Sequence, residues 1–236
     1  MSTRRPSPPA FVPVAPQPRR YAGVSAEERQ KQRRERLIEA AFDVFGREGY
    51  RQSTMRLICA QARLTERYFY ESFATLDDVY LAVHRRQSAA CRQRIVEALM
   101  KAPLDDGVAQ TRAGLTAFFE FIREDPRRAQ ILLIDAVTAG LTNPRNLNAA
   151  VSQYAELLRE RMRKRYPKAV EQHHLDVDYV VAGFVGLIIH SASLWVERDF
   201  QTPIEVLVEH NVYAWRGLRE WLEGPPQVTL PASPAP

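Results

Sequence analysis

Two very short helical segments, set between capping residues, constrain the fold more than any other feature. Ser53 or Thr54 can cap the first of them, and Thr65 can cap the second. Thr75 and Asp78 then have the spacing of a capping box that begins a longer helix. Helices this short are marginal alone in water. The sequence therefore predicts that both pack on a longer neighbour.

The preceding segment supplies that neighbour. Ser25 and Glu28 have capping-box spacing, and Gly49 is suited to end a helix. Between them, apolar residues fall on one face of a 3.6-residue period: Leu37, Ile38, Ala41, Phe42 and Phe45. We expect one helix between Ser25 and Gly49, with an apolar face that receives the two short helices.

The rest of the chain is expected to be helical as well. No alternation of period two is long enough for a sheet, and the interior prolines mark helix boundaries. Thr202 with Glu205 is expected to cap the last helix. Helices are predicted to begin at Thr75 and to lie near 105–123, 126–140, 145–165, 176–199 and 203–222. The proline-rich stretches 1–24 and 224–236 are expected to be a disordered arm and tail.

Positive charge is concentrated in the first part of the chain. The 236 residues carry a net charge of +5, yet the first 90 hold 16 Lys and Arg against 10 Asp and Glu. This asymmetry indicates a polyanionic partner for the N-terminal part alone. The longest apolar run, near 180–189, is judged too short to span a bilayer, so no membrane association and a cytoplasmic location are expected.

Two short helices joined by a tight turn on a longer helix describe a helix-turn-helix DNA reader. Burial of Leu64, Ile58, Phe69 and Phe73 against the first helix would fix the second short helix. Its outward side then carries the predicted base-reading residues Thr65, Glu66, Arg67 and Tyr68, of which Arg67 suits guanine. Phosphate contacts are predicted for Arg36, Thr54, Arg56 and Tyr70.

The segment 49–83 resembles the TetR family of bacterial transcriptional regulators. The similarity lies in Gly49-Tyr50, in Thr54, in the Tyr-Phe-Tyr-x-x-Phe run of 68–73 and in the acidic start at 75–78. It implies phosphate contacts for Thr54 and Tyr70 and base contacts for 65–68. The sequence departs from the family at three positions. Arg63 stands where the family usually has glycine, Leu76 where a basic residue is common, and Ser72 where a His or similar polar residue is frequent.

The resemblance also implies an organisation and a function. Residues 25–74 would be the DNA-binding domain, and 75–223 a helical domain that senses a ligand and dimerises. We expect a homodimeric, sequence-specific regulator of double-stranded DNA, most simply a repressor released by a small-molecule effector. The resemblance leaves activation or repression open and names no ligand.

The C-terminal part offers candidates for both tasks. The helices at 176–199 and 203–222 have broad apolar faces that need burial, and the expected dimer contacts are Val180, Phe184, Leu187, Leu207, Trp215 and Leu218. Aromatic residues with an occasional polar group suit a pocket for an apolar or aromatic effector. The candidates are Phe118, Phe119, Phe121, Ile122, Tyr154, His190 and Trp195, for each of which plain core packing is the alternative.

Catalytic alternatives have little support. The sequence has no glycine-rich phosphate loop, HExxH or CxxC motif, and Cys59 and Cys91 read as reduced, buried thiols. His173 and His174 with Asp176 are expected at a surface rather than on a metal. No enzyme activity, cofactor or metal is expected. A sequence-tolerant architectural DNA binder, which would use the arginines of the arm for phosphates, and a helical enzyme are the alternatives kept.

Overall fold

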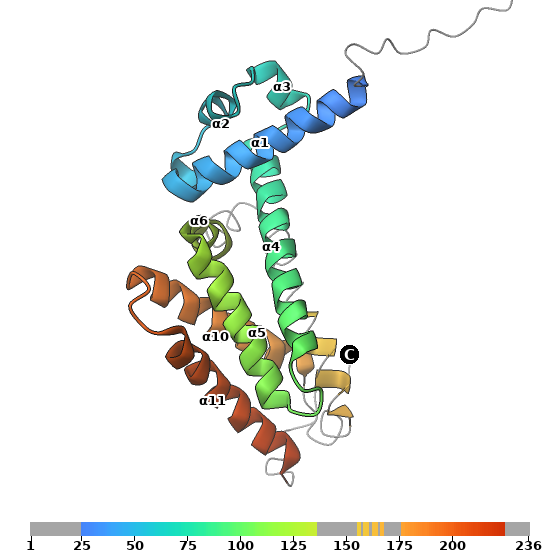
Figure 1. The fold of residues 1–236 in the computed structure, drawn as a ribbon, viewed down its shortest axis with the longest axis vertical. Coiled ribbons are helices and arrows are strands. Elements are labelled where there is room, and N and C mark those ends of the chain that lie inside the picture. The colour runs from blue at the N-terminus through green and yellow to red at the C-terminus, as the bar shows by residue number, and fades with distance from the viewer. Residues whose placement is uncertain are drawn as a thin grey trace, which may run out of the picture.

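The described residues of the computed structural model are 25–135, 155–156, 158–160, 162–164, 166–167 and 176–224. Every element among them is helical, which confirms the predicted all-α fold class. The N-terminal helices form a cap on one end of a long helix, and the other helices lie along its remaining length (Figure 1). The arm 1–24, nearly all of the tail 224–236 and most of the helix predicted at 145–165 lie outside these residues.

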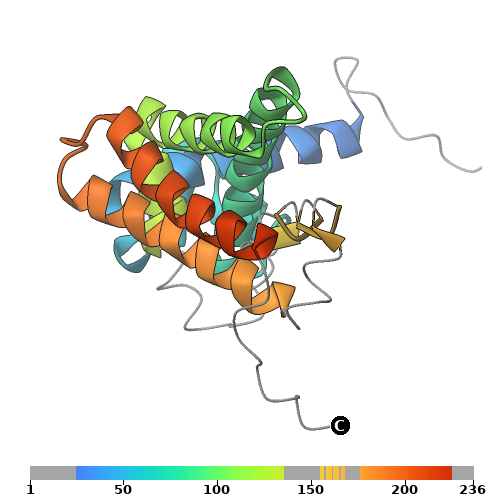
Figure 2. The same ribbon diagram turned by 90° about the horizontal axis from the view of Figure 1, so that it is seen from below.

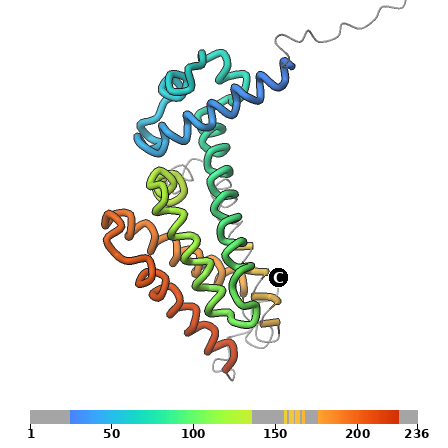
Figure 3. Tube along the Cα trace, viewed as in Figure 1, coloured from blue at the N-terminus to red at the C-terminus, as the bar shows by residue number. Residues whose placement is uncertain are grey.

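The cap and the body differ in their elements. The cap consists of α1 (Ala26–Glu48), the 3₁₀ turn η1 (Tyr50–Gln52), α2 (Met55–Ala62) and α3 (Glu66–Tyr70). The body consists of α4 (Leu76–Lys101), α5 (Gly107–Glu124), α6 (Pro126–Ala129), the π-helix η2 (Gln130–Ile134), α10 (Val177–Glu197) and α11 (Ile204–Glu223). The chain trace shows α4 running from the cap to the far end of the molecule (Figure 3).

The predicted capping residues set the starts of the N-terminal helices. The hydroxyls of Ser25 and Thr54 each accept a backbone N–H from the first turn of their helix, at 3.1 and 3.2 Å. Thr75 and Asp78 form the reciprocal capping box that begins α4. Thr65 occupies the N-cap of α3 without a side-chain bond to the helix. Its hydroxyl is therefore not engaged in capping.

Two helix ends require a left-handed backbone. Gly49, with φ 75°, ends α1 as predicted, and its N–H donates to the Phe45 carbonyl at 3.0 Å. Arg63 ends α2 with φ 52° and ψ 46°. A residue with a Cβ pays about 1–2 kcal/mol for this conformation. The turn of the helix-turn-helix is therefore strained at Arg63 rather than rebuilt around it.

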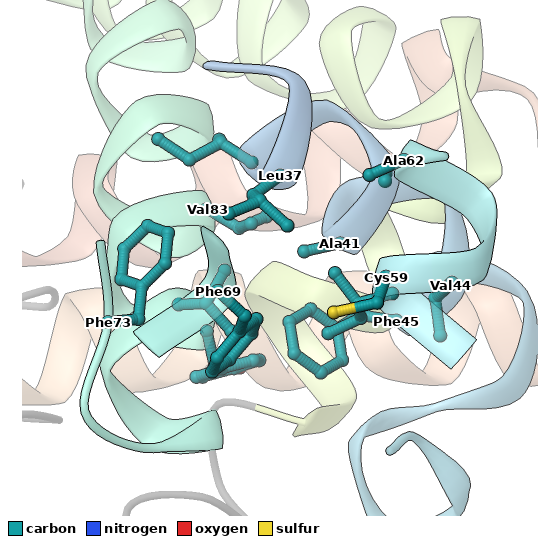
Figure 4. Close-up of a cluster of buried hydrophobic side chains, with 14 of the residues drawn as sticks. Leu37, Ala41, Val44, Phe45, Cys59, Ala62, Phe69, Phe73 and Val83 are labelled. Atoms are coloured by element: carbon teal, nitrogen blue, oxygen red, sulfur yellow. The ribbon is translucent and has the colours of Figure 1, made fainter. Parts of the chain in front are cut away.

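One apolar cluster holds the cap together (Figure 4). Leu37, Ala41 and Phe45 of α1 are fully buried, and Phe69 of α3 packs at 1% exposure. The predicted contacts of Ile58 and Phe73 with this core are confirmed, and Leu64 and Phe42 pack at its edge. Val79 and Val83 of α4 join the same cluster, so the long helix shares the core of the cap.

A second cluster forms the body. Helix α5 lies beside α4 and α11, while α10 crosses behind them (Figures 1 and 2). Phe119 of α5 and Trp195 of α10 meet edge to face with ring centroids 5.7 Å apart. The capping box predicted at Thr202 and Glu205 is wrong: Pro203 is the N-cap of α11, without a side-chain cap. The Thr202 carbonyl instead accepts the Trp195 indole N–H at 2.8 Å, because the indole is buried and needs a partner.

The chain after α6 differs from the α-helix predicted over 126–140. Residues Gln130–Ile134 form a π-helix, closed by a bond from the Asp135 N–H to the Gln130 carbonyl. This segment contacts both α4 and the cap: the Tyr80 hydroxyl of α4 donates to the Ile131 carbonyl at 2.9 Å, and the Asp135 carboxylate accepts the Tyr50 N–H of the cap at 3.0 Å. Local insertions of this kind often mark functional segments.

Arg127 of α6 also connects the body to the cap. Its guanidinium pairs with Asp43 of α1 and with Asp125, and it stacks on the Phe42 ring at 4.6 Å. A Cβ placed on Gly46 would lie 2.4 Å from the Arg127 Cβ. Glycine is therefore required there for α1 and α6 to approach. We call these contacts, together with those of Tyr80 and Asp135, the junction.

Helix α10 is long and apolar enough, by length and composition alone, to cross a membrane. The apolar run near 180–189 was expected to be too short for this, but the helix that contains it spans 21 residues. Only 22% of that stretch is buried. The helix therefore presents an apolar face that the described residues leave uncovered.

Candidate nucleic-acid interface

The N-terminal end of α3 is exposed, as a reading helix requires. Thr65, Glu66 and Arg67 are all exposed, and the Arg67 side chain is 84% accessible. Tyr68 is half-buried, because the Arg33 guanidinium of α1 lies 4.4 Å from its ring centroid. The buried Phe69 next to them fixes the helix in the core, which keeps the backbone that carries these four side chains in a constant orientation.

Residues suited to phosphate surround this end of α3. Thr54 is exposed at the N-cap of α2, where its oxygen accepts the Leu57 N–H and its own O–H remains a donor. Arg56 is exposed and pairs with Glu66 through Nε at 3.3 Å, and Tyr70 is exposed as well. Nη groups left free on a guanidinium are the ones that reach phosphate or a base edge.

Arg36 differs from these residues. Its Nη2 donates to the Ala62 carbonyl at 2.7 Å, at the C-terminal end of α2. The bond ties α1 to α2 and satisfies a carbonyl that the end of a helix leaves without a partner. Arg36 thus has a structural role that the sequence did not reveal, while its predicted phosphate contact stays a prediction.

The sequence analysis also missed a cluster around Glu71. Its carboxylate lies 3.3 Å from Arg67 Nε and 3.4 Å from Arg33 Nη2, and its backbone carbonyl accepts from the Gln30 side chain. The Arg67 contact has i, i+4 spacing and was visible in the sequence. The Arg33 contact joins residues far apart along the chain, and only the packing of α1 on α3 brings them together.

The residues proposed for an effector pocket are mostly core in the described structure. Phe118, Phe119, Phe121, Ile122 and Trp195 are buried in the cluster of the body, while His190 is exposed on α10. Tyr154 lies outside the described residues, as do His173 and His174.

The predicted dimer residues divide into two groups. Leu187 is exposed, and Val180, Phe184 and Leu218 are half-buried. Leu207 and Trp215 are buried inside the protomer, where they pack on α11's own neighbours. Any face shared with a second copy therefore uses the exposed side of these helices instead.

Comparison with known proteins agrees with this geometry. The model of bacterial regulatory proteins of the tetR family matches residues 37–83, which run from α1 through the helix-turn-helix into α4. The helix-turn-helix region of the chain belongs to the tetR family. It is a DNA-binding transcriptional regulator rather than an enzyme.

Relatives match this TetR-family regulator over most of its length. The HTH-type transcriptional activator FasR of Mycolicibacterium smegmatis is 24% identical over 188 residues, which is 79% of this chain and 83% of the relative. The fatty acid degradation regulator FadR of Bacillus halodurans shares the fold with a TM-score of 0.65, at 18% identity, over 81% of this chain and 95% of that one.

A third relative was solved with a ligand. FadR of Bacillus subtilis, in complex with stearoyl-CoA, superposes with a TM-score of 0.66 at 18% identity, over 76% of this chain and 95% of that chain. At such identities the likeness establishes the fold of the TetR-family regulator and no individual contact.

Proposed function

We propose that this TetR-family regulator is a homodimeric repressor that reads a specific operator and is released by a small apolar effector. The exposed N-terminal end of α3, held by a buried core and flanked by phosphate-binding side chains, is the observation that carries the proposal. Thr65, Glu66, Arg67 and Tyr68 read bases, while Arg36, Thr54, Arg56 and Tyr70 hold the backbone.

The reading roles are matched to chemistry. Arg67 offers both Nη groups to guanine O6 and N7, because its contact with Glu71 uses only Nε. Glu66 keeps one carboxylate oxygen free to accept from a cytosine amino group, because Arg56 engages only the other. Such a site discriminates between sequences, which an architectural binder does not.

A second copy is the proposed cover for the open face of α10 and α11. Tyr179 is 81% exposed and Tyr213 58%, and Leu187, Leu194 and Val206 are also exposed. Along α10 these positions recur at helical spacing, with Gly183 and Gly186 among them. Nothing lies within 4 Å of a Cβ built on either glycine. A helix-turn-helix protein needs two DNA-binding domains to reach two half-sites. A symmetric dimer would supply the second domain and would also cover the apolar face.

An apolar effector, of the class of long-chain acyl thioesters, is proposed for the body. Support comes from its aromatic and aliphatic composition and from the stearoyl-CoA bound by the related FadR. The effector would bind more tightly to a state of the dimer in which the two DNA-binding domains are spaced differently. This difference in affinity would shift the population toward that state. The junction is the connection through which such a change reaches α1.

Gel-shift titration at several salt concentrations tests the reading roles. The probes are a duplex enriched from a random library by the wild-type protein and a scrambled duplex of equal length. Arg67→Ala should lose about 1–3 kcal/mol of discrimination between them. Arg36→Ala should weaken binding to both duplexes and lower the salt slope by about 1. Equal loss on both duplexes for Arg67→Ala contradicts base reading by this residue.

Sedimentation of the purified protein tests the dimer. We expect a concentration-dependent dimer, and Leu187→Asp should shift it toward monomer, whereas Glu197→Gln, an exposed change at the end of the same helix, should not. A monomer that partitions into liposomes through α10 would overturn this part of the proposal.

Activation is the second candidate, because the relative FasR is named an activator. A reporter placed behind the enriched sequence distinguishes the two signs. A repressor lowers transcription until an acyl thioester is supplied, whereas an activator raises it.

A further inference from the structure

We propose that Glu71 is a specificity-determining positioning residue, which orients two of the four base-reading side chains without touching DNA itself. The inference rests on the proposed reading roles of Arg67 and Tyr68. Its basis is one carboxylate shared by two guanidiniums from different helices: Arg67 of α3 at 3.3 Å and Arg33 of α1 at 3.4 Å.

The first branch of this cluster acts on Arg67 directly. An exposed arginine occupies many rotamers, and holding it for a base contact costs side-chain entropy. Glu71 restrains Arg67 through Nε and leaves both Nη groups, which form the bidentate pair with guanine, unengaged. The restraint therefore pre-organises the reading geometry without competing for it.

The second branch acts on Tyr68 through Arg33. The Arg33 guanidinium bonds Glu71 and lies 4.4 Å from the centroid of the Tyr68 ring. Since the ring packs against this cation, the side chain of Tyr68 is held against α1 instead of moving freely. Gln30 adds a bond from α1 to the Glu71 carbonyl. One carboxylate thus connects α1 to both readers.

A carboxylate in this place is otherwise unfavourable for DNA binding. Glu71 is 32% exposed beside a surface that must meet phosphates, and its charge opposes theirs. Its pair with Arg67 adds little stability, because Arg67 is 84% exposed. Its pair with Arg33, in which both side chains are largely covered, ties α1 to α3. Affinity for DNA does not account for the carboxylate, whereas selection of one orientation at the base edges does.

The experiment is a double-variant cycle measured on two duplexes. The specific duplex is the one enriched from a random library by the wild-type protein, and the other has the same composition in scrambled order. Glu71→Gln should lower the affinity ratio between them by about threefold to tenfold, part of the value of one bidentate pair. Affinity for the scrambled duplex should stay unchanged or rise, because a negative charge is removed.

Coupling to Arg67 distinguishes positioning from a general effect. In the Arg67→Ala background, Glu71→Gln should lower the affinity ratio much less than it does alone. The base pair at which Glu71→Gln relaxes the sequence preference should be the one at which Arg67→Ala relaxes it. Glu71→Asp keeps the charge but shortens the reach, so it should lose discrimination too. Glu28→Gln, the same charge change at an exposed position of α1, should leave the ratio unchanged.

Two results overturn the inference in different ways. If Arg67→Ala lowers the ratio but Glu71→Gln and Glu71→Asp do not, Glu71 does not position the reader and the reading role stands. If Arg67→Ala itself leaves the ratio unchanged, the proposed reading role fails, and the inference that depends on it fails as well.

Discussion

Two clusters of three charged groups join α1 to its neighbours, and their arrangements of positive and negative charge are opposite. At the junction, the Arg127 cation lies between the carboxylates of Asp43 and Asp125. On the reading side, the Glu71 carboxylate lies between Arg33 and Arg67. The first is half-buried between helices, and the second opens to solvent at its reading end.

The difference lies in what each cluster can stabilise. Half-buried charges lose hydration and must be paired, so loss of one partner is costly. The exposed Arg67–Glu71 pair contributes about 0–1 kcal/mol and serves mainly to orient Arg67, whereas Arg33 and Glu71 are covered as much as the junction charges. We therefore expect the junction to set stability and communication between body and cap, and the Glu71 cluster to set sequence preference.

Helix α4, which carries the cap and the body together, supplies the largest expected effect. Burial lowers the pKa of His84 from 6.5 to about 4, where the ring contacts Ser88 at 3.2 Å. As the pH falls, the unfolded chain takes up this proton before the folded chain does. The contribution of neutral His84 to the free energy of unfolding is therefore fully present above about pH 6.5, and about 3 kcal/mol is lost as the pH falls toward 4. Urea titrations across this range measure the slope.

The matched variants for His84 are simple. His84→Gln should flatten this slope, whatever its effect on stability at neutral pH. His190→Gln, at an exposed position of α10, should keep it. A slope that survives His84→Gln would assign it to other groups.

Gly46→Ala tests the close approach at the junction. The new Cβ would lie 2.4 Å from the Arg127 Cβ and 3.1 Å from its Cα, so backbone must move. We expect a loss of about 2 kcal/mol in unfolding free energy, with the ratio of specific to scrambled DNA affinity unchanged.

Gly217→Ala is the control for that variant. Nothing lies within 4 Å of its added Cβ, and alanine favours the helix by about 1 kcal/mol. Similar behaviour of both alanine variants would show that the contact with Arg127 does not constrain the junction.

Asp43→Ala separates the two clusters further. Arg127 would keep Asp125 and lose its partner on α1, which should cost about 1 kcal/mol in thermal unfolding. Glu35→Ala removes an exposed carboxylate that pairs with Arg86 and should cost less than about 0.5 kcal/mol. Equal costs would mean that the junction pair is as weak as a surface pair.

Arg63→Gly, in the turn before the reading helix, is expected to change the free energy of unfolding least. Relief of the left-handed strain outweighs the extra freedom of glycine in the unfolded chain, so stability should rise by about 0.5 kcal/mol. Arg47→Gly, in the last turn of α1, should instead lower it by about 1 kcal/mol. Thermal unfolding of both variants decides whether strain at Arg63 is real.

The helix-turn-helix could be predicted almost completely because its signals are local. Thr54 and Thr75 cap their own helices, and Gly49 ends its own. The prediction failed at the start of α11. The helix has the adjacent Pro203 as its N-cap, so the Thr202 hydroxyl is not in the capping position, and the Thr202 carbonyl accepts the Trp195 indole N–H. The π-helix after α6 likewise has no local signal.

The sequence by itself determined the N-terminal helices, the core of the cap and the exposure of Thr65, Glu66 and Arg67, because periodicity and capping act within a few residues. Tertiary structure alone decided that Glu71 joins Arg33, that Arg36 ends on the Ala62 carbonyl and that Arg127 enters the space left by Gly46. Each of these contacts joins residues far apart in the chain, and only the packing of helix on helix sets their distance.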